Sequence, residues 1–360
     1  MFRFGDPGGR MYANVGTGNA NILAHWTSFI NNAGNVVVSA GNGRTGGSSL
    51  RFQLASFTSG YLTKTLDSQA TWGVASGFRH SLINTAQYAI IQLSDAGTNQ
   101  IDLRINPDQT LSVTRNGTVL GTSSFSILVN VYYHIELKVL IHPSAGTVEL
   151  RINGVPRIGP LTGLNTRNTA NSSANQILLG TINQASVTTA GTSQVDFDDI
   201  VVWDSQATDA NGLADIHDFI GDCGLTWLLP TGAGTTTQFT PDSGANYARV
   251  NEATPDGDTS YVSDANVGDI DTYAMADLPA NIVAVKSVAV CHFARKTDTA
   301  SRSIVAEIRT NATNYSHITP ASLSNGYFYD FSNWGLNPNT GAAWTVADIN
   351  AIEMGQKIAS

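Results

Sequence analysis

The stretch Val131–Ile158, VYYHIELKVLIHPSAGTVELRINGVPRI, decides the fold. From Val131 to Ile141, apolar side chains alternate with mostly polar ones, which is typical of a strand with one dry face and one wet face. The alternation resumes after Gly146 and ends at Asn153-Gly154, the strongest short-range signal for a hairpin. A sheet that is apolar on one face needs a second layer to cover it, so the stretch predicts a β-sandwich.

The residues before this stretch extend the same pattern. Short apolar runs at Tyr88–Leu93, Gln100–Ile105 and Thr110–Thr114 are separated by turn residues such as Asp95-Ala96-Gly97 and Asn106-Pro107-Asp108. Strand-like runs at intervals of roughly ten residues are the signature of an antiparallel sandwich. The sequence therefore predicts an all-β fold.

The length and the distribution of charge indicate two domains. The chain has 360 residues, enough for two. Residues 1–205 carry 12 basic and 11 acidic residues, whereas residues 206–360 carry 7 and 17. Turn residues dominate between these halves. We expect a first domain over 1–205, a linker over 206–220, and a second, smaller β-sandwich over 221–360, in which Thr345 and Asp348 form the capping box of a short helix.

The same features exclude several kinds of partner. An acidic second half argues against nucleic acid, whose phosphates need a basic patch. No run approaches the roughly 18 apolar residues of a membrane span.

The first residues lack the basic start and apolar run of a signal peptide, so we expect synthesis in a cytoplasm. Cys223 and Cys291 are too few for a disulfide framework and are expected to be reduced.

A resemblance supports the sandwich. Tyr133-His134, Asn153-Gly154 and the strand Phe197-Asp198-Asp199-Ile200-Val201-Val202-Trp203-Asp204 resemble the concanavalin A-like, laminin-G-like jelly roll. In that family a strand of the form F-D-D-hydrophobic closes the sheet. The resemblance covers about residues 1–205 and implies a jelly-roll domain there.

The second half resembles another module. Phe219–Asp222, Leu228–Pro230, Thr254–Tyr261, Asp271–Tyr273 and Trp344-Thr345 are similar to a module of tailed-bacteriophage virion proteins, where it follows a concanavalin A-like domain in this order. The resemblance implies a virion structural protein, either a capsid decoration or a tail or fibre component. It would be made in the host cytoplasm, assemble with other virion proteins as a homo-oligomer, preferably a trimer, and contribute to assembly or to adhesion on host surface glycans.

One acidic cluster is a candidate for calcium, which prefers oxygen ligands. It comprises Asp196, Asp198, Asp199 and Asp204. Strict alternation places Asp196 and Asp198 on one face of their strand together with Val202, and Asp199 on the other. Because the carboxylates then point in opposite directions, capping and turn roles are favoured, with Asp198 and Asp199 kept as calcium candidates.

A looser acidic run contains two further calcium candidates, Asp256 and Asp258. Their surroundings lack the spacing and the terminal Glu of a calcium-binding loop, so a solvated acidic surface is favoured. We predict no cofactor, with calcium the one possibility left open.

Catalysis requires paired carboxylates, or a nucleophile with a base. Glu136 and Glu149 stand singly on separate strands, the histidines are scattered, and neither G-x-S-x-G nor H-E-x-x-H occurs. We therefore predict no catalytic residues and no enzymatic activity, and a polysaccharide depolymerase is the least favoured of three function classes.

A glycan-binding adhesin is the alternative to a structural protein. Trp26, Trp72 and Trp203 lie in apolar contexts and are expected in the core. Exposed aromatic rings near polar loops could stack on sugars, and Tyr132, Tyr327 and Tyr329 are better placed for that role.

Overall fold

The structure, a computed structural model, describes residues 1–6, 25–31, 34–45, 47–54, 59–81, 86–182 and 193–360. The chain forms two compact units. The jelly-roll unit comprises Arg3–Ser205 and Asp218–Leu225, and the C-terminal unit comprises Met1–Phe2, Gln206–His217 and Thr226–Ser360. The segment expected to be a linker is thus divided between them. Strands dominate both units, which confirms the predicted all-β fold.

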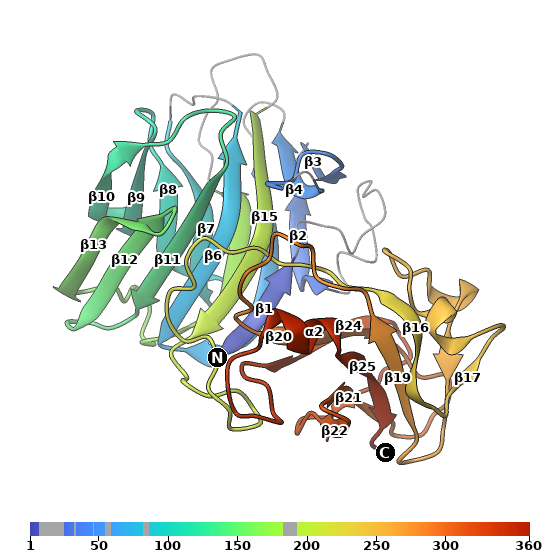
Figure 1. Ribbon diagram of the computed structural model, residues 1–360. Coiled ribbons are helices and arrows are strands. Elements are labelled where there is room, and N and C mark those ends of the chain that lie inside the picture. The colour runs from blue at the N-terminus through green and yellow to red at the C-terminus, as the bar shows by residue number, and fades with distance from the viewer. Residues whose placement is uncertain (7–24, 32–33, 46, 55–58, 82–85, 183–192) are drawn as a thin grey trace. The chain divides into compact units, whose positions relative to one another are not determined.

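Two sheets form the jelly-roll unit, and their strands run side by side in Figure 1. Sheet A has the order β13-β12-β11-β6-β15-β4-β3, with β1 paired to β15. Its strands are β1 (Phe2–Asp6), β3 (Gly34–Ser39), β4 (Ser49–Leu54), β6 (Thr71–His80), β11 (Tyr133–Leu140), β12 (Gly146–Ile152), β13 (Val155–Leu164) and β15 (Ser193–Asp204).

Sheet B has the order β10-β9-β8-β7-β14-β5-β2. Its strands are β2 (Ser28–Asn31), β5 (Gly60–Gln69), β7 (Tyr88–Asp95), β8 (Thr98–Ile105), β9 (Thr110–Arg115), β10 (Thr118–Ser126) and β14 (Ala174–Ile182). Buried apolar side chains of both sheets form the core of the sandwich, among them Phe52, Trp72, Phe78, Ile91, Leu103, Leu137 and Phe197.

The predicted hairpin joins β12 to β13. Ile152 pairs directly with Val155, so Asn153 and Gly154 form a two-residue turn. Their φ angles of 50° and 74° are the positive values that such a turn requires. One strand earlier, Ile135, Leu137 and Val139 of β11 are buried, as the alternation predicted.

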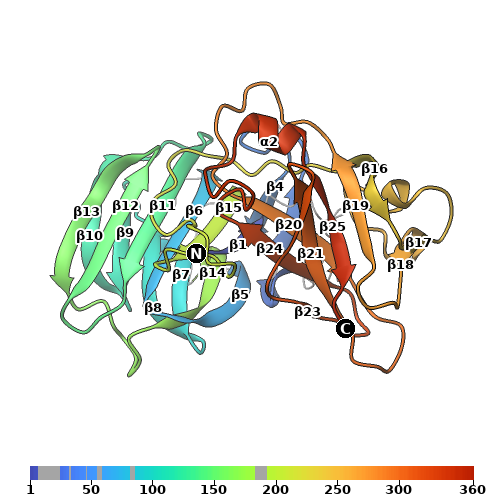
Figure 2. The same ribbon diagram turned by 60° about the horizontal axis from the view of Figure 1, so that its bottom comes forward.

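The C-terminal unit is the second, smaller sandwich (Figure 2). Its largest sheet has the order β16-β19-β25-β21-β22, with β23 paired to β21, and the pairs β20-β24 and β17-β18 complete it. The strands are β16 (Pro230–Thr237), β17 (Thr240–Pro241), β18 (Val262–Ser263), β19 (Ile270–Met275), β20 (Val288–Ala294), β21 (Ser303–Thr310), β22 (Thr313–Ser316), β23 (Ala321–Ser322), β24 (Phe328–Trp334) and β25 (Glu353–Ile358). Helical turns η1 (Asn246–Arg249) and η2 (Gly257–Thr259) and helix α2 (Val346–Asn350) lie between strands.

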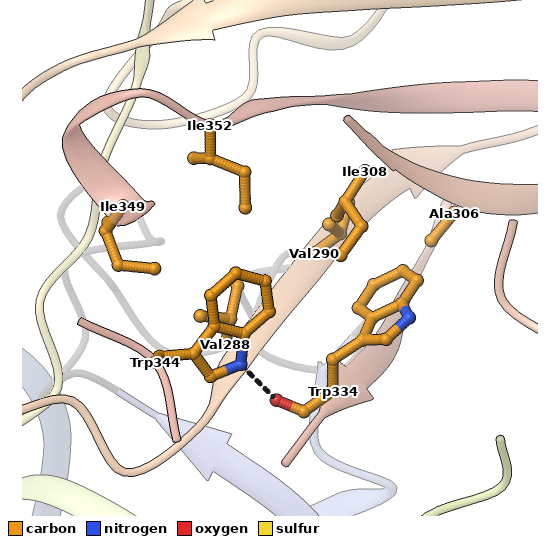
Figure 3. Packing of buried hydrophobic residues seen from close by; sticks show 8 residues of the cluster. All are labelled: Val288, Val290, Ala306, Ile308, Trp334, Trp344, Ile349 and Ile352. Atoms are coloured by element: carbon orange, nitrogen blue, oxygen red, sulfur yellow. Dashed lines mark hydrogen bonds between the residues drawn. The ribbon is translucent and has the colours of Figure 1, made fainter. Parts of the chain in front are cut away.

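An apolar core holds this unit together (Figure 3). Its members come from β20, β21, β24 and the α2 region: Val288, Val290, Ala306, Ile308, Trp334, Trp344, Ile349 and Ile352. The Trp344 indole N–H donates to the carbonyl of Trp334 at 3.0 Å, which pairs a polar group that burial would otherwise leave unsatisfied. The capping box of α2 forms between Thr345 and Asp348, as predicted.

Candidate functional site

The outer face of sheet A, which points away from sheet B, carries the candidate site. On β11 this face presents His134, Glu136 and Lys138, opposite Gly77, Ala75 and Gly73 of β6 respectively. The small residues of β6 leave room for larger side chains above them. A Cβ at Gly77 would lie 3.0 Å from Cδ of Arg44, so the Arg44 side chain occupies part of this room.

This face is not the wet surface that the alternation predicted. His134 is 1 % exposed and Glu136 is fully buried. Their cover is the segment Asp218–Leu225, which belongs to the same unit and which we call the strap.

The middle of the strap is held by Glu136 and Arg44. Glu136 Oε1 accepts hydrogen bonds from the backbone N–H groups of Ile220 at 2.8 Å and Gly221 at 3.1 Å. Arg44 donates to the carbonyl of Cys223 at 2.7 Å and forms an ion pair with Asp222. One carboxylate of β11 and one guanidinium of the turn between β3 and β4 thus fix the strap backbone.

The two ends of the strap have their own contacts. Lys138 Nζ lies 2.9 Å from Asp218 Oδ1. The Arg151 guanidinium lies over the Phe219 ring, 3.8 Å from its centroid, a geometry in which the ring face attracts the cation. At the far end, Asp199 Oδ1 accepts from the N–H of Leu225 at 2.9 Å.

Beneath the strap, three buried polar atoms have no hydrogen-bond partner among the described residues. They are Nδ1 and Nε2 of His134 and Oε2 of Glu136. Buried polar groups are nearly always paired, so unpaired ones indicate a missing partner such as a water or a ligand. We call these three atoms and the residues that surround them the strap pocket.

Burial governs protonation in the strap pocket. Burial, together with the nearby Arg44 guanidinium, lowers the pKa of His134 to about 4. Burial raises the pKa of Glu136, in opposition to the hydrogen bonds from Ile220 and Gly221. Burial also raises the pKa of the Cys223 thiol to about 12. At neutral pH the imidazole and the thiol are therefore both uncharged.

A second polar cluster lies further along the same face, around Asp196 of β15. Its carboxylate bridges Arg51 Nε at 2.8 Å and Arg79 Nη2 at 2.8 Å. The Arg79 guanidinium lies 4.8 Å from the ring centroid of Tyr132, whose hydroxyl donates to the carbonyl of Asn42 at 2.6 Å. Tyr132 is thus half-buried within a polar network and not a free stacking platform.

The calcium candidates of β15 serve as hydrogen-bond acceptors. Asp198 Oδ2 accepts from the N–H of Arg44 at 2.8 Å, and its Oδ1 accepts from the N–H of Asp199 at 2.9 Å. Asp199 Oδ2 lies 3.3 Å from Arg44 Nε. These contacts are the capping and turn roles that the sequence favoured.

The predicted assignment of these side chains to the two faces is wrong beyond Asp198. A β-bulge between Asp198 and Val201 inserts an extra residue, and Asp199 has a φ of 51°. The bulge switches the alternation, because two residues then oppose one on the partner strand. Val202 consequently pairs with Val74 on the core face, away from Asp198, which pairs with Gly77.

The other two calcium candidates lie in the C-terminal unit. Asp256 Oδ1 accepts from the N–H of Ser260 at 3.1 Å. Asp258 pairs with Arg295 at 2.8 Å and accepts from the Tyr327 hydroxyl at 2.7 Å. Within the described residues, no group of three or more His, Cys, Asp and Glu side chains is arranged to hold a metal ion.

The aromatic candidates mostly pack inward. Trp26, Trp72 and Trp203 are buried, as predicted. Tyr329, expected to be exposed, is buried, and its ring centroid lies 4.7 Å from that of Phe293. Tyr327 stacks on the same Phe293 ring at 4.6 Å.

No described helix is both long enough and apolar enough to cross a membrane.

In the sequence, His134 and Glu136 stand as isolated residues without a catalytic or binding motif. The alternation of β11 already places both side chains on the same face of the strand, and this is the one sequence feature that relates them. Their partners are far away in the sequence: Ile220 is 84 residues from Glu136. No local pattern could have shown that the strap covers them.

Several solved structures are similar to less than half of this chain. No protein-family model and no curated protein matches the chain. The cellulose-induced protein Cip1 is 14% identical with a TM-score of 0.37, over 48% of this chain and 87% of that one. An alginate lyase from Corynebacterium sp. is 14% identical with a TM-score of 0.33, over 43% and 76%. A sialidase from Trypanosoma rangeli is 11% identical with a TM-score of 0.31, over 43% and 25%.

These comparisons correct one prediction. The absence of a catalytic pair from the sequence predicts that the protein is not an enzyme, and this prediction is wrong. The similar structures include alginate lyases and sialidases, which are enzymes. Since catalytic groups can converge from distant strands, the lack of a local motif does not exclude enzymatic activity.

Proposed function

We propose that the protein binds glycans and that the strap pocket is its sugar site. The observation that carries this proposal is the set of unpartnered atoms of His134 and Glu136. A neutral imidazole donates through one nitrogen and accepts through the other, while a carboxylate oxygen accepts. Neighbouring hydroxyls of a sugar ring both donate and accept, so a vicinal diol matches this set.

The charges around the strap pocket favour a neutral sugar over an anion. The Arg44 guanidinium, which acts on His134, is paired with Asp222 and lies 3.3 Å from Asp199. The Arg151 guanidinium, which acts on Glu136, lies over the Phe219 ring. A phosphate or a uronate carboxylate beside Arg44 would compete with the carboxylate of Asp199, which lies on β15 and does not move with the strap, and like charges repel at short range. A neutral, hydroxyl-rich ligand carries no charge and is not repelled in this way.

For the biological setting, we propose a bacteriophage virion, in which the protein decorates the capsid or belongs to the tail and adheres to host surface glycans. The support is the resemblance of both halves of the sequence, in the same order, to virion proteins. Other virion proteins and further copies of the chain, preferably as a trimer, would be its partners. Antibody labelling of intact particles tests this setting, and particles that carry no label would contradict it.

The binding proposal is tested by calorimetry of the full chain against neutral and uronate polysaccharides. His134→Ala and Glu136→Ala should each weaken binding at least about fivefold, because each removes a buried hydrogen-bonding group worth about 1–3 kcal/mol. Arg115→Ala, a change at a half-buried residue of sheet B in the same unit, is the matched control. If no polysaccharide binds, or if both pocket variants bind as the unmodified protein does, the proposal fails. Analysis of the same mixtures for shortened chains shows whether binding is accompanied by cleavage.

A further inference from the structure

The strap is attached to sheet A in part by exposed contacts. Of its eight residues only Ile220 is buried, and Asp218, Asp222 and Gly224 are exposed. The side chains of the two aspartates are 62% and 54% exposed, and they pair with Lys138 of β11 and with Arg44 of the turn between β3 and β4. Ion pairs at such exposure contribute little to stability, so much of the attachment rests on a few hydrogen bonds and on Ile220.

The strap also fits poorly what it covers. Glu136 Oε1 accepts from two strap N–H groups, but Glu136 Oε2 and both ring nitrogens of His134 make no hydrogen bond. The Asp222 carboxylate of the strap lies 4.0 Å from Nδ1 of the imidazole. Leaving buried polar groups unpaired disfavours the covered state relative to one in which water or a ligand reaches them. A weakly held segment over an unsatisfied polar surface is a segment that opens readily.

We infer that the strap is a releasable cover of the sugar site, which opens to admit ligand to His134 and Glu136. This inference rests on the proposed function. In the closed form the pocket is buried, and only molecules with an open strap can bind sugar. The apparent affinity is therefore the intrinsic affinity multiplied by the fraction of molecules whose strap is open. Weakening the strap on its own side should therefore increase affinity without touching the residues that bind sugar.

Opening can be measured without knowing the ligand. Diethyl pyrocarbonate modifies uncharged, accessible imidazoles, and burial keeps His134 uncharged at neutral pH. Peptide mass spectrometry gives the modification rate of each histidine in the full chain. The exposed His217 serves as an internal reference. In the unmodified protein, His134 should react at least about tenfold more slowly than His217, because reaction waits for the strap to open.

The test variant is Phe219→Ala/Asp222→Ala, which removes the contacts with Arg151 and Arg44 from the strap side. The reaction rate of His134 should rise about tenfold and that of His217 should stay constant. The affinity for whichever polysaccharide the unmodified protein binds should rise by a similar factor, since both depend on the open fraction. Asp298→Ala, which removes an exposed ion pair with Arg302, is the control. Asp222→Asn, a milder strap variant, should show smaller changes of the same sign if the double variant unfolds.

The outcomes separate the two proposals. An unchanged His134 rate in both strap variants overturns the cover, and so does a faster His134 rate with unchanged sugar affinity. If the His134 rate rises but neither protein binds any polysaccharide, the strap opens as inferred and the glycan-binding function fails.

Discussion

The carboxylate of Glu136 and the backbone N–H of Ile220 form a 2.8 Å hydrogen bond across 84 residues of sequence. The same oxygen accepts from the next N–H, that of Gly221. A single side chain of β11 thus pairs two consecutive backbone donors, which would otherwise be left without partners near the sheet surface. This arrangement makes Glu136 a residue on which the position of the strap depends.

Replacement of Glu136 should therefore loosen the strap. Glu136→Leu leaves both N–H groups unpaired and is expected to lower the free energy of unfolding by about 1–3 kcal/mol. Glu136→Gln retains an acceptor oxygen and should cost less. Urea unfolding measures both, and hydrogen exchange at Ile220 and Gly221 locates the effect. Equal stability of the Leu variant and the unmodified protein would show that these hydrogen bonds contribute nothing.

The His134 imidazole should make the fold sensitive to acid. Its pKa is about 4 in the folded protein, against an ordinary value of 6.5. Between these values the unfolded chain binds more protons, so stability is complete above pH 6.5 and falls as the pH approaches 4. The loss amounts to at most about 3.5 kcal/mol, since the two pKa values differ by about 2.5 and one pKa unit corresponds to about 1.4 kcal/mol.

The Glu136 carboxyl acts with the opposite sign. Its pKa is raised in the folded protein, so its contribution is complete below the ordinary value of 4.5 and is lost as the pH rises through the raised value. His134→Asn isolates the histidine effect. This variant should lose less stability than the unmodified protein between pH 6.5 and 4 in urea titrations, while the exposed control His217→Asn should not. Parallel pH profiles for His134→Asn and the unmodified protein would contradict the assignment.

Local features of the fold could be predicted from the sequence because their causes are local. Asn153 and Gly154 determine their turn through the φ angles that they tolerate, and Thr345 and Asp348 form a capping box within four residues. The alternation of β11 depends only on the period of a strand. None of these features depends on which residues lie across the sheet.

The site could not be predicted in the same way, since it depends on long-range contacts. The β-bulge at Asp199 exists within the pairing of β15 with β6, and it reverses the faces that simple alternation assigns. His134 appears as a polar residue on a wet face until a distant segment covers it. Composition also gave no sign of the strap, whose residues have ordinary turn chemistry.

The small residues of β6 should be intolerant of substitution. A Cβ at Gly73 would lie 2.0 Å from Cε2 of the Trp203 indole, far inside contact distance. Trp203 is 1 % exposed and has little freedom to move. Gly73→Ala is expected to lower the free energy of unfolding by at least about 1–3 kcal/mol, the usual cost of overpacking. Gly326→Ala, where nothing lies within 4 Å of the added Cβ, is the control for thermal unfolding of the two variants. Similar melting temperatures would show that Trp203 is displaced easily.

The final prediction concerns the extent of the jelly-roll domain, which we propose folds on its own. The fragment 1–205 should unfold cooperatively, but it lacks the strap, so Glu136 and Arg44 lose their partners. The fragment 1–225 restores Asp218–Leu225, and we expect it to be more stable than 1–205 by about 1–3 kcal/mol, the worth of a few hydrogen bonds after ordering of the segment.

The fragment 1–217 is the matched control, because it adds twelve residues that belong to the C-terminal unit and none of the strap. It should unfold at the same urea concentration as 1–205. A gain in stability already present in 1–217 would assign the effect to chain length instead of to the strap. Equal stability of 1–217 and 1–225 would mean that the strap contributes nothing to the fold. Aggregation of all three fragments beside a soluble full chain would show that the jelly roll needs the rest of the protein to fold.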